Sequence, residues 1–123
     1  MCSFRVNGEF HVIGGRSDTV SSVEYRHYKM EPNSAVLLDQ MPFPFRNGRC
    51  ADFKSGTAAI ACASSNNAKG CWAYDGSKWS MVGSTQNDHY NGGVSSFNGG
   101  AIIVGGYRDR RGSTEFFDES GIV

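Results

Sequence analysis

The segment Asn98-Gly99-Gly100-Ala101-Ile102-Ile103-Val104-Gly105-Gly106 begins with an Asn-Gly turn signal and continues as an apolar run that ends in two glycines. Asn7-Gly8 and Val12-Ile13-Gly14-Gly15 repeat these features 91 residues earlier, without a gap. The same offset of 91 aligns Ser113-Thr114-Glu115 with Ser22-Val23-Glu24. Self-similarity at a fixed spacing is typical of repeat architectures, so the sequence predicts a repeat protein.

A less similar copy lies between these two stretches. Gly56 stands 48 residues after the first turn glycine and 43 residues before the last. The same alignment places Ile60-Ala61-Cys62-Ala63 on the glycine-ending strand and Tyr74-Asp75 opposite Phe117-Asp118. Two repeats of about 45 residues account for the full offset. We therefore expect three copies, the last one truncated, at approximately 1–45, 46–91 and 92–123.

Each copy is expected to form four short β-strands. In the middle copy these strands are predicted at 49–53, 57–62, 70–74 and close to 79–82. Aromatic and β-branched residues favour strands, whereas clusters of Gly, Asn and Ser mark the turns between them. No apolar spacing of three and four residues is sustained long enough to predict a helix. The predicted class is all-β.

The overall composition excludes some functions. The chain has 123 residues, with 12 basic and 12 acidic side chains and a formal net charge of zero. A balanced charge gives no electrostatic argument for binding nucleic acid. No stretch approaches the roughly 18 apolar residues that would predict a membrane span. Neither a nucleic-acid partner nor a membrane-spanning segment is therefore expected.

These residues resemble kelch repeats. The family pattern is an apolar strand ending in Gly-Gly, a polar loop, a Glu-x-Tyr/Phe-Asp strand and a Trp a few residues later. The chain shows this pattern in the two Gly-Gly strands, in Glu115-Phe116-Phe117-Asp118 and in Tyr74-Asp75-Gly76-Ser77-Lys78-Trp79. The middle copy departs from it with Cys62-Ala63 in place of Gly-Gly, and the first copy has Arg26 at the aromatic position, where Tyr25 or Tyr28 could substitute.

The resemblance implies about two and a half four-stranded blades of a kelch-type β-propeller. Propellers close with about four to eight blades, so this ring is incomplete. We expect the chain to be a fragment that needs the remaining blades, or other copies of itself, to close the ring. The glycines are expected to allow positive φ at the strand ends, and the aromatic residues to fill the space between blades. These structural roles are assigned to Gly14, Gly15, Gly105, Gly106, Tyr74, Trp79 and Phe117.

No residue pattern points to catalysis, and no metal or cofactor is expected. The three histidines, His11, His27 and His89, fall at unrelated places in the repeat and are interpreted as ordinary surface or interblade residues. The chain contains no nucleophile elbow, phosphate loop or zinc-protease motif. A propeller enzyme of the galactose-oxidase type is a minor alternative, but its Tyr, His and Cys ligands have no matching motif here.

The four cysteines leave the cellular compartment open. Cys62 and Cys71 flank the predicted loop 63–70 and could lie opposite each other, at the Cα separation of about 5.5 Å that a disulfide requires. Four buried free thiols are the alternative. Cys2 and Cys50 occupy the same repeat position, one blade apart. A Cys62–Cys71 bridge would indicate an extracellular protein, whereas free thiols would suit a cytoplasmic adaptor.

Partner binding is expected on the loops that join the second strand to the third and the fourth strand to the next blade. In the kelch family such loops engage partner peptides. Arg108, Arg110 and Arg111, with Tyr107 and Tyr90, are predicted to anchor an acidic peptide, because guanidinium groups pair with carboxylates and stack on rings. A solvated loop whose charges pair among themselves is the alternative. The full set of candidate residues is Arg16, Asp18, Asn66, Lys69, His89, Tyr90, Tyr107, Arg108, Arg110 and Arg111.

The function that this resemblance implies is a non-catalytic protein-binding module. Kelch proteins recruit substrates to ubiquitin ligases or bind cytoskeletal partners. An extracellular recognition or adhesion domain with a hairpin disulfide is the alternative. Thiol state would separate the two.

Overall fold

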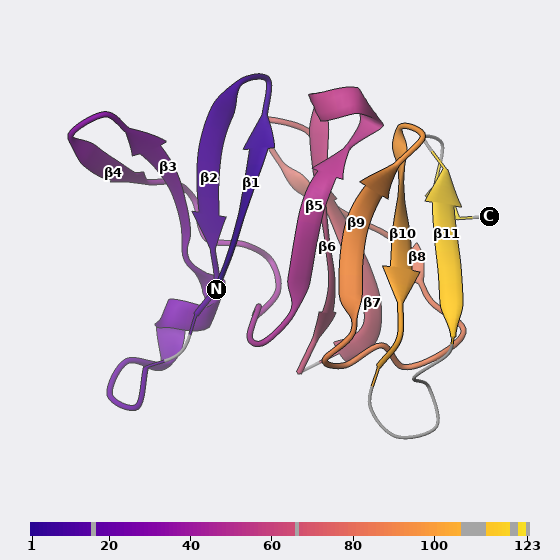
Figure 1. The fold of residues 1–123 in the computed structure, drawn as a ribbon. Coiled ribbons are helices and arrows are strands. Elements are labelled where there is room, and N and C mark those ends of the chain that lie inside the picture. Colours follow the sequence, from indigo (N-terminus) through magenta and orange to yellow (C-terminus); the bar gives the residue numbers. More distant parts are fainter. Residues whose placement is uncertain (16, 66, 107–112, 119–120, 123) are drawn as a thin grey trace.

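The computed structural model describes residues 1–15, 17–65, 67–106, 113–118 and 121–122. Within these residues the chain forms three antiparallel four-stranded sheets and two single-turn 3-10 helices (Figure 1). The predicted all-β class is confirmed. Neither described helix is long and apolar enough to cross a membrane.

The three sheets follow one another along the chain, each as a simple meander. The first contains β1 (Cys2–Val6), β2 (Glu9–Ile13), β3 (His27–Glu31) and β4 (Ser34–Leu37). The second contains β5 (Arg49–Phe53), β6 (Ala58–Ser64), β7 (Asn67–Tyr74) and β8 (Trp79–Ser84). The third contains β9 (Gly93–Phe97), β10 (Gly100–Val104), β11 (Thr114–Asp118) and β12 (Gly121–Ile122). The helices are η1 (Ser21–Tyr25) and η2 (Lys54–Gly56).

The offset of 91 residues is reproduced in the backbone conformation. Asn7 and Asn98 both have φ of 50°, and the glycines that follow them have φ of 81° and 79°. Gly14 and Gly105 both have φ of 69°. Positive φ at both central positions is the geometry of a tight hairpin turn, which Asn-Gly adopts readily. The positive φ predicted at the glycine-ended strands is confirmed.

The first turn of the middle copy is two residues longer than that of the first copy, since four residues separate the paired Phe53 and Ala58 and two separate Val6 and Glu9. Lys54, Ser55 and Gly56 all have positive φ, so this turn is longer than the Asn-Gly turns. After the turn, Ala63 has φ of 60° and takes the conformation of Gly14, which it follows by 49 positions. The sequence alignment, which used 48 throughout and placed Cys62 on the first glycine, is therefore wrong by one residue in this strand.

Three further details depart from the sequence expectations. The loop predicted between the second and third strands of the middle copy is mostly strand, because β6 runs to Ser64 and β7 begins at Asn67. The third sheet has a fourth strand, β12, which pairs with β11. In the first copy, η1 occupies the stretch that was compared with β11, and His27 begins β3 instead of a tyrosine.

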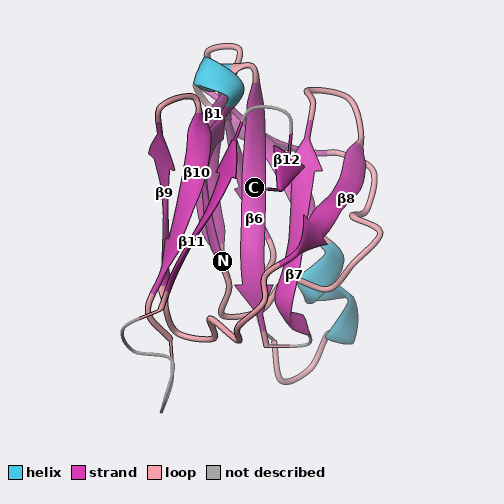
Figure 2. Cartoon of the chain, turned by 90° about the vertical axis from the view of Figure 1, so that its right-hand side faces the viewer, coloured by secondary structure: helices cyan, strands magenta, loops and turns pink. Residues whose placement is uncertain are grey.

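The first strands of the three sheets lie next to one another, in the order β1, β5, β9 (Figure 1). Backbone hydrogen bonds link their turns, from Asn7 N–H to the Gly56 carbonyl at 2.8 Å and from Lys54 N–H to the Gly99 carbonyl at 2.7 Å. The view in Figure 2 looks onto the third sheet, with β9 at one edge. Each sheet therefore packs face to face on the next one.

Two apolar interfaces hold the sheets together. The first interface, between the first and second sheets, contains Phe4, Val6, Ile13, Met41, Phe43, Phe45, Ala59, Ala61 and Tyr74, with Trp72 and Trp79 packed against them. The second interface, between the second and third sheets, contains Phe53, Ala58, Ile60, Cys62, Ala63, Cys71, Ala73, Ala101, Ile103 and Phe117. The aromatic residues predicted to fill the space between repeats, Tyr74, Trp79 and Phe117, lie in these interfaces.

Candidate functional site

Loops from all three sheets gather at one end of the molecule, the lower end in Figure 1. We call this end the loop rim and define it as the described residues of 14–26, 44–48, 63–69, 85–92 and 105–106. Hydrogen bonds join its segments, from Gly15 N–H to the Phe45 carbonyl at 3.2 Å and from Ser65 N–H to the Arg46 carbonyl at 2.8 Å. The loops are thus fixed to one another and to the sheets.

The predicted binding residues fall into two groups. Asp18 and Lys69 lie on the loop rim with exposed side chains, and Tyr90 is half-buried there. The Tyr90 backbone N–H donates to the Asp88 carboxylate at 2.9 Å. The remaining predicted residues, other than His89, lie outside the described residues: Arg16, Asn66, Tyr107, Arg108, Arg110 and Arg111.

His89 is fully buried, with 0% of its surface exposed. Its Nδ1 lies 2.6 Å from the Gly105 carbonyl oxygen and its Nε2 lies 2.7 Å from the Glu115 carboxylate. The ring is therefore held between two oxygen atoms of the third copy, one from a backbone carbonyl and one from a carboxylate. The predicted role of His89 as a partner contact is replaced by a structural one, which is to fasten the loop 85–92 to the third sheet.

Glu115 supports the same loop. Its carboxylate accepts hydrogen bonds from the backbone N–H of Gln86 at 2.6 Å and of Asn87 at 3.0 Å, in addition to His89. Burial alone would raise the pKa of Glu115, but these hydrogen bonds and the nearby positive charge outweigh it, so the pKa lies below its ordinary value. The carboxylate is therefore ionised at neutral pH.

Arg46 is the basic residue that the structure adds to the rim. Its Nη1 lies 3.8 Å from the Glu24 carboxylate, and its buried Nε has no hydrogen-bond partner. The side chain is 36% exposed. The partly exposed guanidinium can donate hydrogen bonds to a carboxylate of a partner, which is the chemistry predicted for the arginines of the third copy.

A chain of hydrogen bonds links three buried or half-buried rings in the first interface. The indole N–H of Trp79 donates to His27 Nδ1 at 3.2 Å, and His27 Nε2 lies 2.8 Å from His11 Nδ1. Because an indole nitrogen can only donate, His27 carries its proton on Nε2 and donates it to His11. This histidine pair was not predicted, because His11 and His27 fall at different places in the repeat.

Both histidines of the pair are neutral at pH 7. Burial, together with the smaller effect of the charge that His11 would carry, lowers the pKa of His27 to about 4. Burial also lowers the pKa of His11, with Glu9 opposing the effect and Lys29 adding to it. The exposed fractions of the two residues are 1% and 3%. The sequence contains a signal for the burial of His11, because this residue stands two positions before Ile13 and therefore on the same, apolar face of the strand.

A groove of about 580 Å³ borders this ring cluster on the side away from the loop rim. Its lining residues are His27, Leu37, Leu38, Asp39, Gln40, Pro42, Tyr74, Gly76, Ser77, Lys78 and Trp79. Among the described residues, no group of three His, Cys, Asp or Glu side chains is placed to hold a metal ion.

The four cysteines form two disulfides in the structure. Cys62 and Cys71 lie directly opposite each other on β6 and β7, with Cα atoms 4.3 Å apart. Cys2 and Cys50 are also bonded, with Cα atoms 6.1 Å apart, and this bond joins β1 to β5 across the first interface. The repeat position predicted to be shared by Cys2 and Cys50 is wrong by one residue, because the strand registers place Cys2 with Arg49, and no bond between the two cysteines was predicted.

The fold and the rim together define an all-β protein of three similar antiparallel sheets, with joined loops at one end. No protein-family model matches the sequence. No curated protein matches it at a significant level either.

Proposed function

We propose that the chain is part of a kelch-type β-propeller and that its loop rim binds a partner protein or peptide. The observation that carries this proposal is the repeat of 91 residues, which has the same turn and strand-end dihedral angles at both ends of the chain. Three four-stranded meanders whose first strands lie side by side are the arrangement expected of successive propeller blades. The repeat motifs and this arrangement of sheets both support the proposal.

The loop rim is the surface best suited to binding. Binding residues are commonly carried by loops that a rigid scaffold positions, and here the loops are tied to one another by backbone hydrogen bonds. Arg46 and Lys69 supply positive charge on the described part of the rim. Arg108, Arg110 and Arg111, which follow the Gly-Gly end of β10 in the sequence, lie outside the described residues and stay predicted members of this set. A partner with acidic side chains fits this set.

The experiment is a binding measurement with fluorescent acidic peptides and matched neutral peptides. We expect the double variant Arg110→Ala/Arg111→Ala and the single variant Arg46→Ala to lose about tenfold or more in affinity, a change of about 1.4 kcal/mol or more. Lys78→Ala is the matched control, because Lys78 is exposed on the β7–β8 turn at the opposite end of the sheets. Unchanged affinity in both rim variants would remove the rim from the binding site.

A second candidate is an extracellular recognition domain on the same fold. The two disulfides favour it, since disulfides persist in oxidising compartments. The intracellular form of the proposal, recruitment of substrates to a ubiquitin ligase or binding to the cytoskeleton, requires a chain that folds with reduced thiols. Alkylation of natively produced protein without reductant separates them, because the extracellular form leaves no cysteine to react.

A further inference from the structure

Each sheet has two faces. We call the face turned toward the next sheet along the chain the forward face and the opposite one the backward face. The forward face of the first sheet carries Val6, His11 and Ile13 and packs into the first interface. The backward face of the second sheet, with Ala59 and Ala61, receives it there. The same relation holds between the second and third sheets across the second interface. The repeat offset therefore tells which residues occupy the forward and backward faces at the two ends of the chain.

The forward face of the third sheet is uncovered. Phe97 and Val104 follow Val6 and Ile13 by 91 positions, and they are 51% and 39% exposed where Val6 and Ile13 are 1% and 0% exposed. Ile102 lies two residues before Val104 on β10, so its side chain points to the same face. It pairs with Phe116, whose ring contacts the Phe97 ring edge-on at 5.9 Å between centroids. Apolar side chains thus line a face whose equivalents are buried in the other two sheets.

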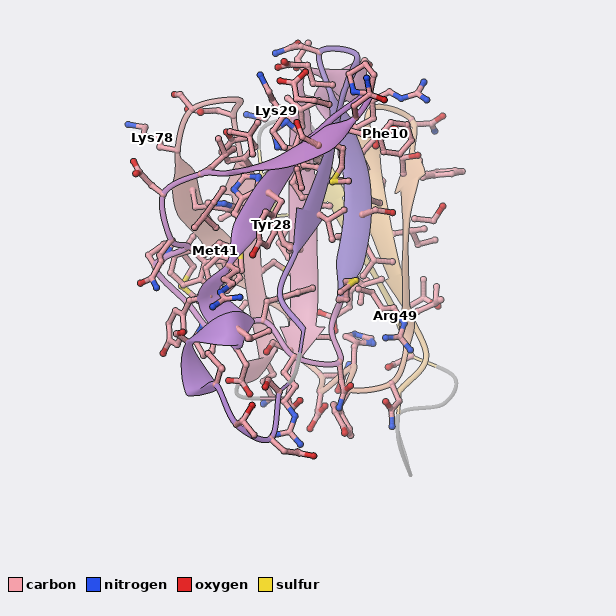
Figure 3. The ribbon with its side chains drawn as sticks, turned by 90° about the vertical axis from the view of Figure 1, so that its left-hand side faces the viewer. Phe10, Tyr28, Lys29, Met41, Arg49 and Lys78 are labelled. Atoms are coloured by element: carbon pink, nitrogen blue, oxygen red, sulfur yellow. A yellow bond between two sulfur atoms is a disulfide. The ribbon has the colours of Figure 1, made fainter. Side chains whose placement is uncertain are left out.

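The backward face of the first sheet is uncovered as well (Figure 3). Phe10 precedes Ala101 by 91 positions, and it is 47% exposed where Ala101 is fully buried. Tyr28 lies on the same face, because it pairs with Val12, and it also pairs with Leu37, which is 58% exposed. The first sheet therefore exposes a backward face of the kind that covers the forward faces of the first and second sheets, and the forward face of the third sheet has no such cover among the described residues.

Both uncovered faces present a phenylalanine ring. On the forward face of the third sheet, Ser95 takes the position of Phe4 and Phe97 takes the position of Val6, each 91 residues later. On the backward face of the first sheet, Phe10 takes the position of Ala59 and Ala101. Phe97 and Phe10 are 51% and 47% exposed, so each face offers one large ring.

We propose that these two faces bind each other between two copies of the chain, the forward face of each copy against the backward face of the other. This inference rests on the proposed propeller arrangement. A head-to-tail interface of this kind forms a closed ring when the rotations add up to a full turn. Three sheets from each of two copies make six blades, a number within the range of about four to eight at which propellers close.

The test is sedimentation velocity with the purified, oxidised 123-residue chain over a range of concentrations. We expect a single species with the mass of two 13.4 kDa chains. A chain that stays monomeric at every concentration, or that forms open polymers, overturns the proposal. These measurements do not involve the loop rim, so their failure is distinguishable from failure of the binding proposal.

Mixed variants test the head-to-tail geometry. Phe97→Asp and Phe10→Asp should each be monomeric alone, because every interface needs one forward and one backward face. Mixed together they should form a heterodimer that binds more weakly than two wild-type chains, since one intact interface remains. If Phe10→Asp alone stays dimeric, or if the mixture stays monomeric, the proposed geometry is wrong.

Two further variants guard against loss of the fold. Met81→Asp should remain dimeric, because Met81 is 47% exposed on β8 of the middle sheet and lies on neither end face. Phe97→Ser copies the neighbouring serines of β9 and should weaken the dimer without adding a buried charge. Near-ultraviolet circular dichroism of each variant confirms that the rings of the first interface keep their native packing.

Discussion

The two interfaces between the sheets are built from different side chains. The first contains a cluster of rings in which Phe4 contacts Tyr74 at 6.1 Å and Trp79 at 5.9 Å between centroids, with His11 and His27 buried beside them. The second is filled mainly by small and aliphatic residues such as Ala101 and Ile103 around two phenylalanines. Equivalent positions of one repeat thus support either an aromatic, partly polar interface or an aliphatic one.

This difference means that the two interfaces respond to different conditions. The first contains two titratable imidazoles and is crossed by the Cys2–Cys50 disulfide. The described buried residues of the second contain no titratable side chain, and the Cys62–Cys71 disulfide lies within a single sheet. Reduction and acid should therefore weaken the first interface more than the second.

The largest expected effect is the loss of the disulfide that crosses the first interface. The Cys2–Cys50 bond closes a sequence separation of 48 residues, whereas Cys62–Cys71 closes only 9. Longer loops lose more chain entropy on closure, so the bonds should contribute about 4 and about 3 kcal/mol respectively. The double variant Cys2→Ser/Cys50→Ser should therefore lower the free energy of unfolding in urea more than Cys62→Ser/Cys71→Ser does.

Mass spectrometry under non-reducing conditions provides the control for this comparison, because it verifies that each variant keeps its remaining bond. Equal destabilisation by the two double variants, or a larger effect of the shorter bond, would contradict the idea that the crosslink between sheets matters more than the one within a sheet.

The next largest effect concerns acid. In the unfolded chain His27 has its ordinary pKa of 6.5, and in the folded protein the pKa is about 4. Below pH 6.5 the unfolded state takes up a proton that the folded state does not, so stability falls as the pH drops from 6.5 to 4. The total loss from this residue is about 3 kcal/mol, and His11, whose pKa is also lowered, adds to it.

The measurement is the free energy of unfolding in urea as a function of pH for the wild type and for His27→Gln. Glutamine can still accept the Trp79 N–H and donate to His11, but it does not titrate, so the curve should become flatter between pH 6.5 and 4. Phe117→Leu, in the second interface, is the matched control and should lower stability equally at every pH. A wild-type curve that is parallel to that of His27→Gln would show that the histidine is not the sensitive group.

Much of the fold could be predicted from the sequence, because turns and strand ends leave local signals. Asn-Gly pairs and Gly-Gly ends require positive φ, and the strands predicted at 49–53 and 79–82 match β5 and β8 closely. The one-residue shift of β6 in the middle copy could not be predicted, because a longer turn after Phe53 leaves no gap that a single sequence reveals. The length of the β6–β7 hairpin was also missed, because polar residues at 64–69 are as typical of a loop as of an exposed strand end.

The site was less predictable, because it depends on pairing between distant segments. His89 and Glu115 are 26 residues apart, and His11 and His27 are 16 residues apart. Only the pairing of strands brings them together. The arginines of the third copy, which the composition of their loop singled out, lie outside the described residues, so their binding role stays a prediction.

The smallest expected effect compares two glutamates that are 91 residues apart in the sequence but differ in structure, since Glu24 lies in η1 and Glu115 lies in β11. The Glu115 carboxylate accepts three hydrogen bonds from the rim loop over the second interface. The Glu24 carboxylate lies 3.8 Å from Arg46 Nη1. The rim loop over the first interface is fixed instead by backbone hydrogen bonds. Glu115→Gln should cost about 2 kcal/mol, because an amide turns a donor toward groups that also donate. Glu24→Gln should cost less than about 0.5 kcal/mol, because a half-exposed ion pair contributes little.

Both variants should be compared by urea unfolding at pH 7, where the Glu115 carboxylate is fully ionised. Because the folded pKa of Glu115 is lowered, its contribution is present above pH 4.5 and is lost as the pH falls through the folded value. The difference between the wild type and Glu115→Gln should therefore shrink in acid, while Glu24→Gln stays close to the wild type throughout. If both variants lost the same amount at pH 7, the loop over the second interface would not depend on the Glu115 carboxylate, and the contrast between the two rim loops would fail.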